Sequence, residues 1–233
     1  GSENKPPVLF VHGIPTSSYL WRNVIGLLQD DYHCYAPDLM GLGDTDVDPW
    51  NTSFHMDAQA EMLEEFMCSL GHDEFSIVCH DQGGAAAQII ATRRSRRVRC
   101  LVITDCVCYD NWPVPIIEKL QLFLRFQAIS DFAVRAGLFK LIESSPLSIF
   151  KHCVHDASKM TKETALEYLR PLHGSRRQRE SFRAFFLAGN ARYTKRIAPD
   201  LKKLEIPTNV IWAAEDRQIP SSWGKKLYEE IPG

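Results

Sequence analysis

The sequence feature that most constrains the fold is the segment from Phe75 to Ala87, FSIVCHDQGGAAA, where an apolar run stops at Asp81 and small residues follow. The apolar run predicts a buried strand, and the residues after Gln82 predict a helix. A reactive side chain at such a turn needs a strained backbone and small neighbours two positions away, here Cys79 and Gly83. The segment therefore favours Asp81 as a nucleophile on a sharp turn over the alternative of a helix N-cap.

The other apolar runs alternate with stretches of helical periodicity, which favours right-handed crossovers and a mostly parallel sheet with helices on both faces. The sequence therefore predicts an α/β fold with a mostly parallel, doubly wound sheet. The expected strands are 7–11, 33–36, 75–80, 99–104 and 207–212, and the expected helices are 19–29, 56–70, 83–94 and 223–231.

The pattern changes between Trp112 and Tyr193, where helical periodicity occurs over 114–129, 131–142, 162–169 and 179–188 without a convincing strand. This predicts an inserted helical cap. We expect residues 3–111 to form the first part of the core, 112–193 the cap, and 194–233 an incomplete second part of the core. The abrupt beginning and end also suggest a chain that lacks segments of a longer protein at both ends.

Amino-acid composition limits the kinds of partner that we expect this chain to bind. The formal net charge of −2 and the pI of about 6.5 give no excess of positive charge for nucleic acid or an anionic membrane. No stretch of 18 apolar residues offers a membrane span. The seven cysteines lack the CxxC spacing of a zinc site, so we expect free thiols in a reducing cytoplasm, with no metal and no cofactor. The oligomeric state stays open.

Four motifs occur in one order along the chain: HGIP at 12–15, a glycine-punctuated loop at 38–43, the turn at Asp81, and a polar segment at 211–220. In this order they resemble the α/β-hydrolase superfamily, and the aspartate resembles its Asp-nucleophile branch of haloalkane dehalogenases, epoxide hydrolases and haloacetate dehalogenases. The resemblance implies an α/β-hydrolase core with a cap, a small-molecule substrate, and an alkyl ester on the aspartate that water later cleaves. A serine-type esterase is disfavoured because the turn holds no serine.

By resemblance, the backbone N–H groups of Ile14 and Gln82 form the oxyanion hole. Asp216 matches the acid of the catalytic triad, with a surface turn as the alternative and Asp105 as a reserve candidate. Haloalkane dehalogenases hold the halide with an Asn at the Ile14 position and a Trp at the Gln82 position, and both are absent here. Epoxide hydrolases usually carry an aromatic residue at the first position and Trp at the second, so neither subfamily fits cleanly.

The residues expected to contact a substrate are His12 of the oxyanion loop and Tyr109 and Trp112 at the entrance to the cap. Tyr168 and Tyr193 are weaker candidates for tyrosines that activate an epoxide. Packing in the core or at a hinge is the alternative for these aromatic residues.

The general base of this family is a histidine that follows one further strand. None of the eight histidines in this chain lies beyond Asp216. The rival hypothesis is therefore a non-catalytic ligand-binding or scaffold protein on the same fold.

Overall fold

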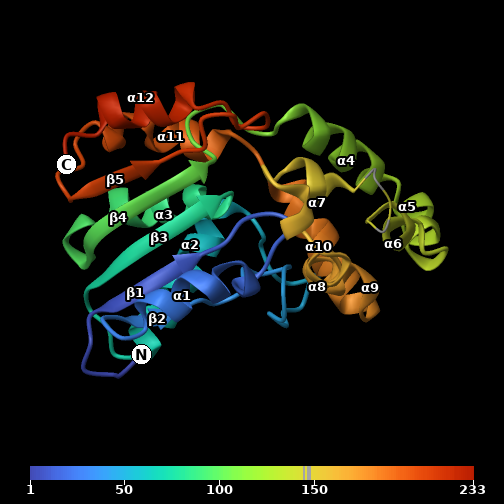
Figure 1. Cartoon of the computed structure of the whole chain (residues 1–233), viewed down its shortest axis with the longest axis horizontal. Coiled ribbons are helices and arrows are strands. Elements are labelled where there is room, and N and C mark those ends of the chain that lie inside the picture. The colour runs from blue at the N-terminus through green and yellow to red at the C-terminus, as the bar shows by residue number, and fades with distance from the viewer. Residues whose placement is uncertain (144, 146–147) are drawn as a thin grey trace.

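The computed structural model describes residues 1–143, 145 and 148–233. Its centre is a five-stranded sheet in the order β2-β1-β3-β4-β5, in which every neighbouring pair is parallel (Figure 1). The predicted parallel sheet is confirmed. The strands are β1 (Pro7–Val11), β2 (His33–Tyr35), β3 (Phe75–Asp81), β4 (Val98–Cys106) and β5 (Thr208–Ile211).

Strand β1 shows how the middle of the sheet is buried on both faces. Its side chains alternate between the two faces, as strand geometry requires. Val8 and Phe10 pack with Trp21 in one cluster, whereas Leu9 and Val11 belong to the larger cluster on the opposite face. A parallel sheet covered on both faces needs such continuous apolar strands.

Helices cover both faces of the sheet. The short 3₁₀ turn at Ser18–Trp21 and helix α1 (Arg22–Leu28) lie on the side of the smaller cluster. Helix α3 (Gly83–Arg93) packs against β3 and β4 on the other side, and α2 (Met56–Ser69) and α11 (Arg192–Leu201) pack on α3. Helix α12 (Ser222–Glu230) lies against the edge strand β5. The predicted doubly wound arrangement is confirmed.

The helical insertion lies beyond the end of the sheet toward which the strand arrowheads point (Figure 1). Two expected helices are each divided: the one over 114–129 breaks at Phe126, and the one over 131–142 breaks at Gly137, which adopts a φ of +74°. The helical spacing of apolar residues continues across such breaks, so the sequence pattern does not reveal them. The helices are α4 (Pro115–Arg125), α5 (Gln127–Arg135), α6 (Leu138–Glu143), α7 (Ile149–His152), α8 (Lys162–Tyr168), α9 (Arg170–His173) and α10 (Arg176–Ala188).

The end of the insertion differs from the expectation. The boundary expected at residue 193 falls inside α11, which was not predicted as a helix and which packs on α3 of the core. Pro199 lies within α11. Because proline disfavours a helix interior, the sequence pattern does not predict this helix. Ile197 and Leu201 are nevertheless buried on the core side.

No described helix combines the length and the apolar character that crossing a bilayer requires.

Candidate active site

The turn between β3 and α3 holds Asp81 in a strained conformation. Its φ is +51°, a left-handed region that residues with a Cβ rarely adopt. The pairing of β3 with β4 shifts register between His80 and Asp81, and α3 begins only two residues later at Gly83. Strained backbones of this kind persist only where the surrounding structure holds them, and they gather at functional sites.

Glycines allow the chain to close around this turn. A Cβ on Gly13 would lie 2.2 Å from Oδ1 of Asp81, and a Cβ on Gly83 would lie 2.2 Å from the carbonyl oxygen of His12. No Cβ fits at such distances, so the loop after β1 and the start of α3 approach backbone to backbone. The close approach presses the loop at residues 12–14 against the Asp81 carboxylate.

One of the two N–H groups expected to form the oxyanion hole donates to the Asp81 carboxylate. The N–H of Ile14 donates to Oδ1 of Asp81 at 2.7 Å, and the N–H of Gln82 lies close enough to lower the pKa of the carboxylate. Burial raises the pKa of Asp81 above its ordinary value. The neighbouring His80 and the two N–H groups lower the pKa only in part, so its net shift is upward. The structure thus brings Asp81, Ile14 and Gln82 together.

Both candidates for the triad acid lie near the carboxyl-terminal ends of two neighbouring strands, β4 and β5. Asp105 is the last residue but one of β4, has a φ of +43° and accepts a hydrogen bond from the N–H of Ala213 at 2.7 Å. Oδ1 of Asp216 accepts from the N–H groups of Gln218 and Ile219, at 2.7 and 2.9 Å, within its own turn. The charge of Asp216 contributes to raising the pKa of Asp81 and of Asp105, which places Asp216 near both.

His12 is completely buried, and both of its ring nitrogens are in use. Nδ1 lies 2.9 Å from the carbonyl oxygen of Gly13, and Nε2 accepts from the N–H of Leu39 at 3.0 Å, which together define the neutral tautomer with the proton on Nδ1. Burial lowers the pKa of His12. His12 therefore fixes the oxyanion loop to the loop after β2, and the geometry leaves it no ring nitrogen for a substrate.

Tyr109 packs against helix α12. Its ring stacks on Trp223 of α12 with ring centroids 6.0 Å apart, and Nζ of Lys226 lies 4.1 Å from its ring centroid. Its carbonyl oxygen accepts from Oγ1 of Thr194 at 2.6 Å. The structure thus places Tyr109 between the core and α12 and does not bring it to the candidate site.

Trp112 lies near Gln82 where the helical insertion joins the core. Its indole Nε1 and the Nε2 atom of Gln82 each lie 2.9 Å from the position that a Cβ on Gly189 would occupy. Trp112 is 5% exposed and Gln82 is 2% exposed. Of the expected substrate contacts, His12 and Trp112 both lie next to residues of the corner, and both ring nitrogens of His12 are already engaged.

The two weaker tyrosine candidates are engaged elsewhere. The Tyr168 ring packs against Phe150, with centroids 5.6 Å apart, and against Tyr19 at 6.1 Å. The Tyr193 hydroxyl accepts a hydrogen bond from Arg192 at 2.5 Å, and its ring stacks on His55.

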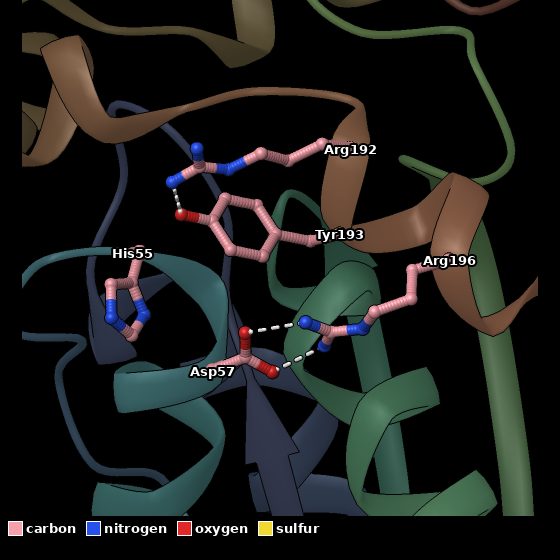
Figure 2. A pocket seen from close by; sticks show the side chains of 5 residues that line it. All are labelled: His55, Asp57, Arg192, Tyr193 and Arg196. Atoms are coloured by element: carbon pink, nitrogen blue, oxygen red, sulfur yellow. Dashed lines mark hydrogen bonds and ion pairs between the residues drawn. The ribbon is translucent and has the colours of Figure 1, made fainter.

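Tyr193 lines an open recess of about 350 Å³ (Figure 2). Arg196 closes one side of the recess with hydrogen bonds of 2.6 and 3.1 Å to Asp57. The side chains that line it are bonded largely to one another, and Asp81 is not among them. The lining residues are His55, Asp57, Arg192, Tyr193 and Arg196.

Two further groups shape the corner, and sequence reasoning missed one of them, Gly189. Nδ1 of His80 lies 3.0 Å from the carbonyl oxygen of Thr104 on β4, which fixes the ring next to Asp81. Gly189 has no local signal in the sequence, because its role depends on a contact with Gln82. Within the part of the chain that the structure describes, no three His, Cys, Asp or Glu side chains gather as a metal site.

Two kinds of comparison show what the chain is similar to in sequence and in fold. Haloalkane dehalogenase 2 of Mycobacterium tuberculosis is 37% identical over 98 residues, covering 42% of this chain and 34% of that protein. The soluble epoxide hydrolase of Corynebacterium sp. (strain C12) is 35% identical over 115 residues, covering 47% and 40%. The match thus spans well under half of either relative.

A solved α/β-hydrolase fold protein from Burkholderia ambifaria superimposes with a TM-score of 0.83 at 19% identity, over 98% of this chain and 80% of that one. At this identity the likeness shows the fold alone. The family model for the alpha/beta hydrolase fold matches residues 6–231. The chain belongs to the α/β-hydrolase fold family.

Proposed function

We propose that this chain carries the nucleophile of a hydrolase that acts through an alkyl ester on Asp81. The observation that carries the proposal is the Asp81 carboxylate itself: it stands on a strained turn, and one of its oxygens is held by the N–H of Ile14 at 2.7 Å. An aspartate used only as a helix N-cap needs neither the positive φ nor a donor from a distant loop.

In the first step, the other carboxylate oxygen of Asp81 attacks an sp³ carbon. A carbon–oxygen bond forms, and the bond to the leaving group breaks with its electron pair. In the second step, water attacks the carbonyl carbon of the ester and gives up a proton to solvent, and the N–H groups of Ile14 and Gln82 stabilise the negative oxygen that develops. Collapse of this intermediate breaks the bond between the carbonyl carbon and the alkoxy oxygen, which takes up a proton, so that an alcohol leaves and the Asp81 carboxylate is regenerated. The same N–H groups thus stabilise the carboxylate before the reaction and the oxyanion during it.

The substrate class that we propose is a small halogenated or related apolar compound, with an epoxide as the alternative. The names of the similar proteins support both versions. Because none of the eight histidines in this chain follows Asp216, we propose that the second step is slow in this chain and that the ester accumulates.

Intact mass measurement tests the proposal after incubation with 1-bromohexane or with styrene oxide. We expect one adduct per chain, which peptide mapping assigns to residues 75–87. The variant Asp81→Asn should form no adduct, whereas the matched variant Asp57→Asn, which changes a carboxylate outside the corner, should label like the wild type. An adduct that persists in Asp81→Asn would exclude Asp81 as the nucleophile.

The second candidate is a ligand-binding protein without catalysis. It is favoured by the side chains at positions 14 and 82 and by the position of the histidines in the sequence. Reversible binding of 1-bromohexane or styrene oxide with no adduct after prolonged incubation would support this candidate. Steady multiple turnover would instead show that this chain supplies a base that we have not assigned.

A further inference from the structure

The recess at the starts of α2 and α11 holds more positive than negative charge (Figure 2). Asp57 is the only acid among the described residues that line it, and it accepts hydrogen bonds from Arg196 at 2.6 and 3.1 Å. Arg93 of α3 donates to the same carboxylate, and Glu61 lies 3.8 Å from Arg93. The two carboxylates thus offset two of the guanidinium groups, and Arg192 stands in the recess as a third.

Arg192 has no carboxylate partner within the part of the chain that the structure describes. Its Nη2 donates to the hydroxyl of Tyr193 at 2.5 Å, and its guanidinium carbon lies 4.7 Å from the centroid of the Tyr193 ring. These contacts hold the guanidinium in place and leave its charge unbalanced, because neither a phenol group nor an aromatic ring carries a net charge. A fixed cation beside an open recess indicates an anion that arrives from outside.

His55 contributes an N–H donor to the same recess. Its Nδ1 accepts from the N–H of Ala58 at 3.1 Å at the N-cap of α2, so the proton of the neutral ring lies on Nε2. The ring stacks on Tyr193 with centroids 5.7 Å apart, which fixes its orientation. Helix α2 has 14 residues, and its start also brings the positive end of the helix dipole to this place.

The chemistry of these groups fits a phosphate group. Guanidinium groups and imidazole N–H groups bind phosphate oxygens through charge-assisted hydrogen bonds. A phosphate monoester carries about two negative charges near neutral pH and three acceptor oxygens, whereas a carboxylate offers one charge and two oxygens. The volume of about 350 Å³ is many times the roughly 30 Å³ of one water molecule, so an organic part fits beside the phosphate.

We propose that this recess binds a phosphate group, with Arg192, Arg196 and His55 as its donors. The inference goes beyond the proposed function and does not depend on it, because Asp81 does not line the recess. The two arginines belong to α11 and His55 caps α2. A bound phosphate group therefore joins these two helices and stabilises the folded chain.

Isothermal titration calorimetry of the whole chain tests the site at pH 7.5 and constant ionic strength. We expect glycerol 3-phosphate to bind at one site per chain, and inorganic phosphate to bind there more weakly because it lacks the organic part. Acetate should bind at least about tenfold more weakly than glycerol 3-phosphate, because it carries half the charge. Equal affinities for the two phosphates support the site with the free ion as its ligand. No binding of either, or binding of acetate as tight as theirs, overturns the proposal.

The variant Arg192→Gln removes the cation that has no acid partner. We expect the dissociation constant for glycerol 3-phosphate to rise about tenfold, the loss of a charge-assisted hydrogen bond. The matched control is Arg22→Gln in α1, on the opposite face of the sheet, where the guanidinium carbon lies 4.0 Å from the centroid of the Tyr19 ring. Its affinity should be unchanged. Equal affinities in the two variants, with melting temperatures that show both are folded, would refute the role of Arg192.

Nuclear magnetic resonance locates the bound phosphate. In protein with ¹⁵N-labelled arginine, the Nε–H signals of Arg192, Arg196 and Arg22 are each assigned by their loss in the corresponding glutamine variant. We expect the first two signals to shift on titration with inorganic phosphate and the Arg22 signal to stay in place. Shifts of all three signals alike would show screening without a site and overturn the proposal.

The variant Asp81→Asn separates this inference from the proposed function. It should bind glycerol 3-phosphate with the affinity of the wild type, whatever the outcome of the labelling experiment. A change of more than about threefold in the dissociation constant would place the phosphate at the corner instead of in the recess and overturn the proposal.

Discussion

The corner at Asp81 and the cap are built in different ways. At the corner the backbone itself makes the close approaches: Gly83 lies against the carbonyl oxygen of His12, and Gly13 lies against the Asp81 carboxylate, at the ends of strands in the middle of a parallel sheet. The helical insertion between β4 and β5, called the cap below, has seven α-helices among its described residues, two of them only four residues long, and ion pairs such as Arg170–Asp44 join its surface to the core. The difference teaches that the position of Asp81 is fixed by main-chain geometry, whereas the cap is joined to the core by side chains.

The largest expected effect on stability tests whether a buried apolar side chain also holds the cap to the core. Phe185 of α10 is completely buried, and its Cβ lies 2.8 Å from the position of a Cβ on Gly41, in the loop after β2. Phe185→Ala should lower the free energy of unfolding by about 4 kcal/mol, because it leaves a cavity where cap meets core. Urea unfolding measures the loss. The matched control is Phe132→Ala, at a ring that is 72% exposed, which should change stability little; equal losses would contradict a cap anchored at Phe185.

The next effect tests the backbone contact at the corner. Gly83→Ala should cost about 3 kcal/mol of unfolding free energy, because its Cβ would overlap the carbonyl oxygen of His12 and neither backbone can yield cheaply. Gly26→Ala, where the Cβ meets open space, should be neutral or slightly stabilising. A loss below about 1 kcal/mol for Gly83→Ala would mean that the corner is as adaptable as the cap.

The pH dependence of stability distinguishes two carboxylates with opposite shifts. Burial raises the pKa of Asp81. For Asp57, burial also raises the pKa, but the charges of Arg196 and Arg93 outweigh it and the net shift is downward. As pH rises through the raised pKa of Asp81, the folded state holds the proton longer than the unfolded state, so ionisation of Asp81 costs stability. Asp57 stabilises the fold above its unfolded pKa of about 3.8 and loses this contribution as pH falls.

Unfolding curves at pH 3 and pH 7 measure this contrast. Relative to the wild type, Asp81→Asn should gain stability between pH 3 and pH 7, whereas Asp57→Asn should lose it. Both variants exchange a carboxyl group for a carboxamide of the same shape, so each serves as the control for the other. The same sign in both variants would show that Asp81 is solvated like a surface carboxylate.

The smallest effect concerns the ion pair between cap and core. Arg170 donates two hydrogen bonds to Asp44, and its side chain is 43% exposed. Arg170→Ala should lower the free energy of unfolding by less than about 1 kcal/mol, and 0.5 M salt should remove most of that loss. A larger loss that salt does not reduce would show that the pair, rather than Phe185, anchors the cap.

The core elements could be predicted because their signals are local. Strand β1 begins and ends where the apolar run does, and the expected helices at 56–70 and 83–94 differ from α2 and α3 by one residue at one end. The cap was harder to predict. Its amphipathic periodicity continues across Phe126 and Gly137, where the chain turns, and Pro199 conceals α11.

Sequence alone determined the succession of the five strands and of the core helices α1, α2, α3 and α12, the parallel sheet, and the position of Asp81 between a buried strand and a run of small residues. These follow from patterns within a dozen residues, where side-chain size and polarity act on their own backbone. Only the tertiary structure decided that Tyr109 turns toward α12, that both nitrogens of His12 are occupied, and that Gly189 meets Gln82 and Trp112. Such contacts join segments far apart in the chain, and they are set by packing of the whole rather than by any local preference.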